Sequence, residues 1–232
     1  MYDIQPRAGG APPGGAPPGG AKPSADGPCE SPCECPIERL IERYAEVATS
    51  TLGHFTDIGA IVGLEPVRRP SRLLGTAVTV RLPHLDGGAI RRALGLVRPG
   101  DVLVIDVSGD ETRACWGELR AYAALERGLA GVVTSGRVTD VGVLSRLDLP
   151  VYSRGASPLT TRTMELEGEV NRAVSIAGVS VSPGDLIVGD DDGVFALSPA
   201  RAEALLGPVL DKQAKEATRR DEVHARHPEW FR

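Results

Sequence analysis

The segment from Ala114 to Asp140 reads ACWGELRAYAALERGLAGVVTSGRVTD, and this stretch decides the fold that the sequence predicts. A carboxylate stands at each end of an expected helix–strand unit, because Glu118 follows Gly117 where the helix begins and Asp140 follows the next strand. Two carboxylates so placed meet only if the N-terminus of a helix lies beside the C-terminal end of a strand. This is the edge at which α/β proteins place their binding sites.

The residues around this segment predict a strand–helix–strand (βαβ) unit. Residues 102–107, VLVIDV, form an apolar and largely β-branched run that is typical of a strand covered on both faces. A helix is expected over residues 116–127 with Gly128 as its C-cap, and a short strand over residues 132–134. The expected apolar face of the helix consists of Trp116, Leu119, Tyr122, Ala123 and Leu125.

Several short pieces of the chain carry a resemblance to a known family. They are PGDVLV (99–104), GEL (117–119), GLAGVV (128–133), SGRVTD (135–140), PGD (183–185) and DDDGV (190–194). Together they resemble the RraA-like family, which includes class II pyruvate aldolases acting on 4-hydroxy-4-methyl-2-oxoglutarate and regulators of ribonuclease activity. The resemblance covers most of the chain, and it implies an α/β fold: a layered α/β/β/α sandwich of the swivelling-domain type.

The resemblance also implies a metal site. In the aldolases of the family, an acidic residue after the first glycine and the last Asp of a DGxxRD motif hold a divalent metal, largely through water. By position these residues are Glu118 and Asp140, and the expected metal is Mg²⁺ or Mn²⁺. The closing helix of a neighbouring subunit adds a Glu, for which Glu216 is the candidate; a solvated charge on an exposed helix face is the alternative. Homotrimers, sometimes paired into hexamers, follow from the same resemblance.

Two positions depart from the family pattern. Thr139 stands where the aldolases have the Arg that clamps the substrate carboxylate, and Ser135 stands where the motif begins with Asp. A hydrogen bond to a charged group contributes about 1.5–3 kcal/mol, so its loss would weaken the binding of pyruvate-type ligands by about ten- to a hundredfold. Arg137 reaches the site only if its loop redirects the side chain.

The candidate site residues follow from these positions. The candidate catalytic residues are Glu118, Asp140, Arg137 and Thr139. Substrate contacts are expected at Gly117, Leu119, Arg120 and Thr139, where backbone N–H groups at the helix N-terminus face an enolate oxygen. The expected small-molecule partner is a keto acid. A Schiff-base aldolase is disfavoured, because the lysines of the chain, Lys22, Lys212 and Lys215, all lie outside the central domain.

Length and composition limit the remaining possibilities. The chain has 232 residues and a formal net charge of −5 without a sustained basic stripe, so nucleic-acid binding gains no support. Residues 1–36 are mostly Gly, Pro and Ala and predict a disordered tail, followed by one α/β domain over 37–220 and an extension over 221–232. Neither a signal peptide nor a membrane span is indicated, so we expect a cytoplasmic protein without membrane contact.

Other polar groups admit two interpretations each. Cys29, Cys33 and Cys35 could bind a soft metal, but a closed zinc site needs four ligands, and incidental thiols in a reducing compartment are favoured. His54 and Asp57 either line the pocket or cap their own loop, and the second interpretation is favoured.

Local patterns predict the remaining elements. A strand is expected over 75–80, followed by a helix over 87–94 whose Gly-rich start lacks the spacing of a phosphate loop. One strand is expected over 176–181, and a hairpin over 186–197 with solvated carboxylates at 190–192. The last element is a helix over 199–220, and whether Gly207-Pro208 interrupts it is left open.

Three functions remain open from the sequence. The retained carboxylates favour a divalent-metal-dependent lyase, either a retro-aldolase for 4-hydroxy-2-oxo acids or an oxaloacetate decarboxylase. The departure at Thr139 leaves two alternatives, which are a non-catalytic regulator that binds a partner protein and a metal-dependent enzyme of the same fold with another substrate.

Overall fold

Strand β4 (Asp101–Ser108) is the centre of the fold in the computed structural model, which describes residues 36–83, 85–164 and 168–230. It lies between β3 (Leu73–Pro83) and β6 (Gly131–Thr134) and runs parallel to both. Its residues 102–105 are buried, as expected of a strand that is covered on both faces. Helix α4 (Glu118–Leu125) connects this strand to β6, which confirms the predicted βαβ unit.

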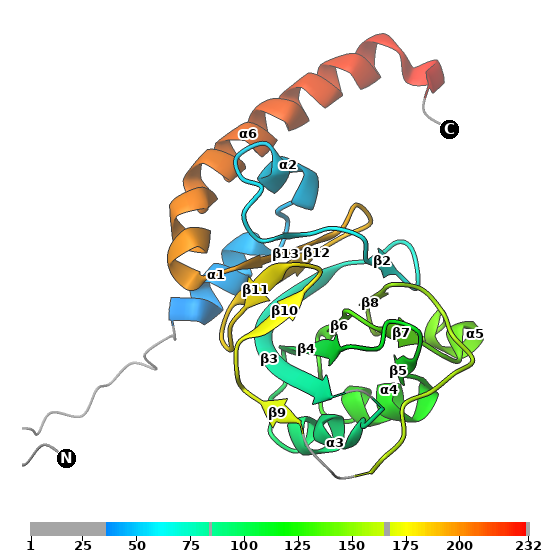
Figure 1. Cartoon of the computed structure of the whole chain (residues 1–232). Coiled ribbons are helices and arrows are strands. Elements are labelled where there is room, and N and C mark those ends of the chain that lie inside the picture. The colour runs from blue at the N-terminus through cyan, green and yellow to red at the C-terminus, as the bar shows by residue number, and fades with distance from the viewer. Residues whose placement is uncertain (1–35, 84, 165–167, 231–232) are drawn as a thin grey trace, which may run out of the picture. The chain divides into compact units, whose positions relative to one another are not determined.

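The main sheet contains nine strands within the described residues (Figure 1). Their order is β1 (Ala60–Ile61), β13 (Val194–Leu197), β12 (Leu186–Gly189), β3, β4, β6, β8 (Val151–Ser153) and β2 (Glu65–Pro66), and β9 (Glu169–Val170) pairs with β3 off this path. The β3–β4–β6–β8 run is parallel, and the other pairs are antiparallel. The first residues of β3 pair with β12 and the later ones with β4, so this strand joins the two halves of a curled sheet.

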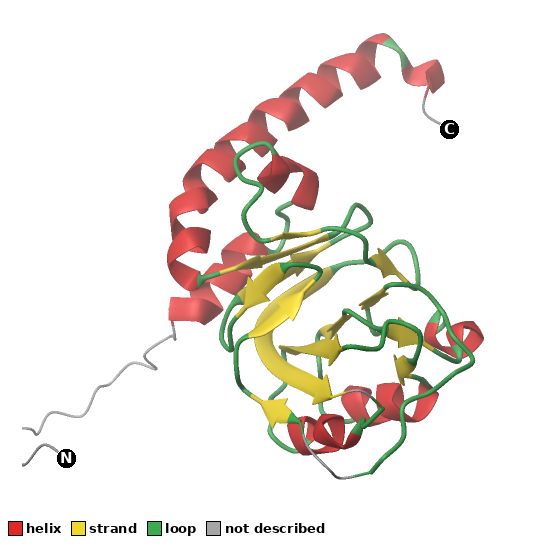
Figure 2. Ribbon diagram, in the orientation of Figure 1, coloured by secondary structure: helices red, strands yellow, loops and turns green. Residues whose placement is uncertain are grey.

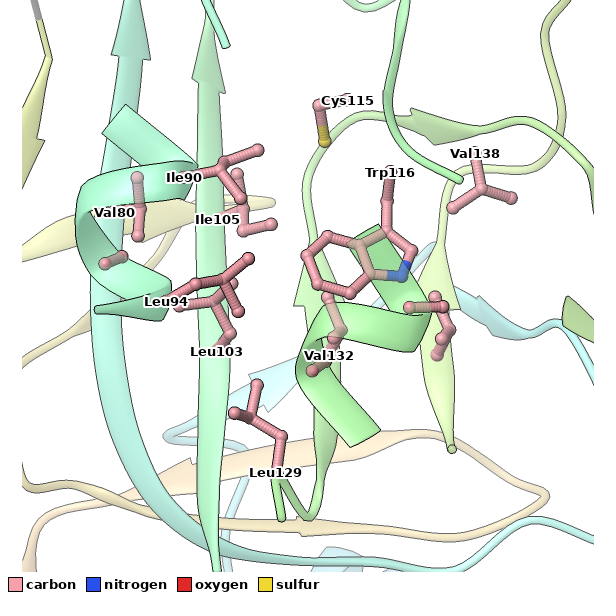
Figure 3. Close-up of a cluster of buried hydrophobic side chains, with 14 of the residues drawn as sticks. Val80, Ile90, Leu94, Leu103, Ile105, Cys115, Trp116, Leu129, Val132 and Val138 are labelled. Atoms are coloured by element: carbon pink, nitrogen blue, oxygen red, sulfur yellow. The ribbon is translucent and has the colours of Figure 1, made fainter. Parts of the chain in front are cut away.

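Three groups of buried side chains define the layers of the fold. Helices α3 (Gly88–Leu94), α4 and α5 (Val141–Leu144) pack on one half of the sheet around Ile105 and Trp116 (Figure 3). Helices α1 (Pro36–Tyr44), α2 (Thr49–Gly53) and α6 (Pro199–Arg226) pack on β12 and β13 (Figure 2). The hairpin of β10 (Val174–Ile176) and β11 (Val179–Val181) fills the inside of the curl. The α/β/β/α sandwich is therefore confirmed.

The short strands β5 (Ala114–Trp116) and β7 (Arg137–Val138) pair with each other in parallel and correct the predicted helix. Trp116 belongs to β5 and is 1% exposed, so it does not lie on the helix. The buried face of α4 consists of Ala121 and Ala124, and Leu119 is 81% exposed. The expected apolar face was therefore wrong, because small residues let α4 approach the sheet and its large side chains point outward.

Two further elements differ from the sequence prediction. Residues 176–181 do not form one strand, because Ala177 and Gly178 adopt positive φ values of 49° and 85° and form the hairpin turn between β10 and β11. Helix α6 continues through Pro208 to Arg226, and the burial of Leu206 and Val209 offsets the hydrogen bond that proline removes.

The carboxylates expected to be solvated at residues 190–192 are in part engaged. Asp190 accepts hydrogen bonds from the backbone N–H of Thr49 at 2.7 Å and from its hydroxyl, and so caps α2. Asp191 accepts one from the Ser71 N–H at 2.7 Å. The hairpin turn thus ties the start of α2 to the sheet.

Parts of the predicted organisation lie outside the described residues. They comprise residues 1–35, which include Cys29, Cys33 and Cys35. The disorder expected for this tail therefore stays a prediction. Within the described ranges, none of the helices combines the length and the apolar character that crossing a membrane requires.

Two buried tyrosines predict how stability depends on pH. Tyr44 and Tyr152 are each 0% exposed, and their hydroxyls donate to backbone carbonyls at 2.8 Å. Burial raises the pKa of both from 10.0 to about 12. Between these pH values the tyrosines lose their protons in the unfolded chain but keep them in the folded chain. The contribution of the two buried hydroxyls to the free energy of unfolding is therefore fully present below pH 10 and is lost as the pH rises to 12. Urea denaturation should show the midpoint falling over this range, and by less in a Tyr44→Phe/Tyr152→Phe variant.

Candidate active site

A pocket of about 180 Å³ lies where the N-terminus of α4 meets the end of β7. It is lined by residues 114–120 together with Thr139, Asp140, Thr160 and Thr161. The Thr139 N–H donates to the Trp116 carbonyl at 2.9 Å and extends the pairing of β5 with β7. This pairing places Gly117, the residue before the helix, against Asp140, the second residue after the strand.

Asp140 is exposed and points toward the start of α4. Its Oδ2 accepts a hydrogen bond from the Glu118 N–H at 3.0 Å, and its Oδ1 accepts one from the Thr139 hydroxyl at 3.3 Å. The backbone of Asp140 is left-handed, with φ 56° and ψ 34°, a conformation that Asp tolerates better than most residues. The two ends of the motif are thus brought together as the sequence predicted.

Gly117 is required by this close approach. Its φ of −164° is extended backbone open to any residue, so conformational freedom is not the reason for glycine here. A Cβ atom at this position would lie 2.6 Å from the Asp140 Oδ2 and 2.7 Å from the Thr139 Cγ2. A side chain would therefore push the carboxylate away from the helix.

Glu118 is half-buried and is held along α4 by its neighbour one turn later. The Tyr122 hydroxyl donates to the Glu118 Oε1 at 2.7 Å, and this hydrogen bond raises the pKa of Tyr122 above its ordinary value. One carboxylate oxygen is therefore engaged, and the other accepts no hydrogen bond from the described residues that would compete with a ligand.

The start of α4 presents two further donors. Intrahelical bonding begins with the Ala121 N–H, which donates to the Gly117 carbonyl at 3.0 Å. The N–H groups of Leu119 and Arg120 find no acceptor among the described residues, as is usual in a first helical turn. With the positive end of the helix dipole, they form a place for developing negative charge.

The Arg120 side chain lines the same pocket. Its Nη1 donates to the carbonyl of Cys115 and to the Thr161 hydroxyl at 3.4 Å, and its Nη2 donates to the Gly87 carbonyl at 3.4 Å. Burial lowers the pKa of Arg120 below its ordinary value, yet an arginine keeps its charge. Cys115 is fully buried, and burial raises the pKa of its thiol, which argues against a nucleophilic role.

Two of the predicted site residues lie away from the pocket. The Arg137 guanidinium donates to the backbone carbonyls of Glu111 at 3.0 Å, Arg154 at 3.3 Å and Ala156 at 3.4 Å, so its loop does not redirect it inward. Glu216 lies on α6, in a groove of about 510 Å³ that Phe55 also lines, and pairs with Lys212 at 2.7 Å.

The surroundings of Glu216 agree with its separation from the pocket. The hydrogen bond from Lys212 lowers the pKa of Glu216, and the charges of His54 and Arg220 act in the same direction. His54 is therefore near Glu216, and neither it nor Asp57 lines the pocket. Within one chain, Glu216 and the Glu118–Asp140 pair lie on helices of different layers.

The donor set of the pocket fits a hard divalent cation bound mainly through water. Glu118 and Asp140 supply carboxylate oxygens, and Mg²⁺ commonly binds through one or two carboxylates while keeping several waters. No cluster of three or more His, Cys, Asp or Glu side chains suited to a metal occurs among the residues that the structure describes.

Sequence reasoning missed three contributors, which are Thr160, Thr161 and Gly87. The first two line the pocket, and Gly87 contacts the Arg120 guanidinium. The glycine pair at 87–88 was visible as a possible anion loop, but no local pattern marks the threonines. They enter only because β5 pairs with the segment around Thr160.

The fold and the pocket define an α/β protein with an acidic site at a helix N-terminus. The model of the RraA-like family, described as Aldolase/RraA, matches residues 47–196, and the chain belongs to this family.

Relatives and solved structures agree with that assignment. A protein from Halalkalibacterium halodurans named "Putative 4-hydroxy-4-methyl-2-oxoglutarate aldolase" is 35% identical over 156 residues, which cover 67% of this chain and 74% of the relative. The crystal structure of Streptomyces coelicolor RraAS2, "an unusual member of the RNase ES inhibitor RraA protein family", superposes with a TM-score of 0.70 at 26% identity, covering 82% of this chain and 99% of that one. The structure of RraA from Thermus thermophilis, an "RNA-processing inhibitor", superposes with a TM-score of 0.58 at 28% identity, covering 65% of this chain and 91% of that one.

Proposed function

We propose that this protein is a divalent-metal-dependent carbon–carbon lyase that acts on 2-oxo acids. Its reactions would be retro-aldol cleavage of 4-hydroxy-2-oxo acids, decarboxylation of oxaloacetate, or both. The observation that carries the proposal is the meeting of Glu118 and Asp140 at a helix N-terminus, where the Glu118 N–H donates to the Asp140 carboxylate. The aldolase name of the Halalkalibacterium halodurans relative supports the reaction class.

The metal proposed is Mg²⁺ or Mn²⁺, held by the two carboxylates. When bound, it would act as a Lewis acid on the keto group of the substrate, an effect of several kcal/mol.

The chain itself positions and stabilises the reacting groups. Gly117 leaves room for the Asp140 side chain, and the hydrogen bond from the Glu118 N–H fixes its orientation. Leu119 and Arg120 line the pocket, and their N–H groups, which have no acceptor among the described residues, would stabilise an oxygen that gains negative charge as the bond to carbon breaks. Such donors act because they are already oriented before the reaction begins.

A second copy of the chain would complete the site, and the proposed assembly is a homotrimer or a hexamer. Leu119 is 81% exposed and Tyr122 is 41% exposed beside the pocket, and a second copy of the chain would cover them there. Glu216 lies away from the pocket of its own chain, so it could act only in a neighbouring one. Sedimentation equilibrium measures the mass of the assembly.

The regulator function remains the second candidate, and one observation favours it. Thr139 is uncharged and Arg137 is directed away from the pocket, so neither supplies the cation that clamps the substrate carboxylate in the aldolases. RraAS2 of Streptomyces coelicolor, described as a member of the "RNase ES inhibitor RraA protein family", shares the fold at a TM-score of 0.70. Such a regulator would bind a partner protein and turn over no keto acid.

The test is turnover of a panel of 4-hydroxy-2-oxo acids and oxaloacetate, with and without Mg²⁺ or Mn²⁺. We expect pyruvate release that requires the metal, disappears with a chelator and returns when the metal is added back. Pyruvate can be followed by reduction with lactate dehydrogenase and NADH. Absence of turnover for the whole panel with both metals would contradict the proposal and favour the regulator.

A further inference from the structure

We infer that the Arg120 side chain binds the carboxylate of the 2-oxo acid, and so performs the recognition that Thr139 cannot perform. The inference rests on the proposed function, because it names the group that holds the substrate at the same site. It assigns a role to the guanidinium itself, beyond the backbone N–H of this residue.

Arg120 is the one cationic side chain that lines the pocket within the described residues. The nearby Arg137 is directed to backbone carbonyls outside it. Arg113 pairs with Asp110 at 3.0 Å and does not line the pocket either. Among the described residues, a negatively charged ligand group in this pocket therefore has Arg120 as its cationic side-chain partner.

The Arg120 guanidinium has only neutral partners in the described part of the chain. They are the carbonyls of Cys115 and Gly87 and the hydroxyl of Thr161. A half-buried charge without a counter-ion is costly, and the partners that offset this cost best are carboxylates or phosphates, which a guanidinium can bind through two parallel hydrogen bonds. The free protein thus holds a cation ready for an anionic ligand.

The position of this cation is built into the surrounding backbone. A Cβ atom on Gly87 would lie 2.5 Å from the Arg120 Nη2 and 2.8 Å from the Thr161 Oγ1. Glycine at this position therefore leaves the space that the guanidinium occupies. The Gly87 N–H in turn donates to the Arg162 carbonyl at 2.7 Å, which fixes the loop beside Thr161.

Charge balance in the pocket favours a carboxylate over a neutral ligand. Glu118 and Asp140 alone would repel a carboxylate, and a divalent metal would offset their two charges. The Arg120 charge then remains for the acid group next to the keto carbon, and the metal is left to act on the keto oxygen.

The experiment measures Arg120→Met and Arg120→Lys against wild type, with Arg127→Met as the control. Arg127 is exposed after the end of α4 and lies outside the pocket. With MgCl₂ present, calorimetry gives the Kd of oxalate, which carries the paired oxygens of a 2-oxo acid. Competition assays compare pyruvate with its uncharged methyl ester, and turnover gives KM and kcat for a 4-hydroxy-2-oxo acid.

We expect Arg120→Met to raise the Kd of oxalate and the KM about ten- to a hundredfold, with a smaller change in kcat. The preference for pyruvate over its methyl ester should disappear, whereas a structural role would weaken acid and ester equally. Arg120→Lys should give an intermediate Kd, because an ammonium group keeps the charge but cannot form the two parallel hydrogen bonds of a guanidinium. Arg127→Met should match wild type.

The outcomes separate the two proposals. If wild type turns over keto acids and Arg120→Met keeps the acid preference and the Kd of oxalate, the inference is overturned and the lyase function stands. If no keto acid is turned over but oxalate binding depends on Arg120, the function is wrong and the anion site stands. If Arg120→Met does not fold, an unchanged Kd in Arg120→Lys overturns the inference, and a raised Kd with a reduced preference for the acid over its ester supports it.

Discussion

Replacement of Asp140 by asparagine is expected to lower kcat/KM for a 4-hydroxy-2-oxo acid by more than about a hundredfold, because under the proposed function it would remove a charged metal ligand and the Lewis-acid effect that depends on it. Asparagine has nearly the same shape and keeps an oxygen that can accept the hydrogen bond from the Glu118 N–H. The fold at this position should therefore survive, and calorimetry should show weakened Mn²⁺ binding.

The matched control for this variant is Asp148→Asn. The Asp148 side chain is 96% exposed and pairs with Arg68 at 3.0 Å, away from the pocket. Its removal should leave Mn²⁺ affinity and kcat/KM unchanged. Equal Mn²⁺ affinity in Asp140→Asn and wild type would show that the metal binds elsewhere.

A second large effect is expected from Gly117→Ala. The added methyl group would lie 2.6 Å from the Asp140 Oδ2, so the carboxylate must move away from the helix N-terminus. A displacement of about 1 Å in a catalytic group can cost about a hundredfold in rate. We expect kcat/KM to fall by about ten- to a hundredfold, with a thermal midpoint close to wild type because Asp140 is exposed.

Gly142→Ala provides the comparison for that substitution. Gly142 lies in α5, shortly after Asp140, and no atom lies within 4 Å of the position that its Cβ would take. The variant should keep full activity and should be as stable as wild type or slightly more stable. If both alanine variants behave alike, the close approach at Gly117 does not control the site.

The fold could be predicted where local patterns are strong. The apolar run at 102–107 became the central strand, because only a strand covered on both faces needs so many adjacent apolar residues. Trp116 was assigned to the wrong element, because helical spacing of apolar residues does not reveal which of them face solvent. The pairing of β5 with β7, which buries Trp116, joins segments that are distant in sequence.

The candidate site divides in the same way. The meeting of Glu118 with Asp140 followed from the ends of one helix–strand unit. The contacts of the Arg120 guanidinium did not, because they involve Gly87 and Thr161, which are 33 and 41 residues away in sequence. The direction of the Arg137 side chain could not be predicted from the sequence either, because it depends on backbone carbonyls that only the folded loop brings together.

The most direct test of a metal-dependent site at Glu118 and Asp140 is the exchange of pyruvate methyl protons with D₂O, followed by proton NMR. Exchange requires removal of a proton next to the keto group, which is the reverse of the step that completes pyruvate release. We predict exchange by wild type with Mg²⁺ or Mn²⁺, none above background with a chelator, and at least about a hundredfold slower exchange in Asp140→Asn. Exchange that persists without metal, or that is unchanged in Asp140→Asn, would contradict the account.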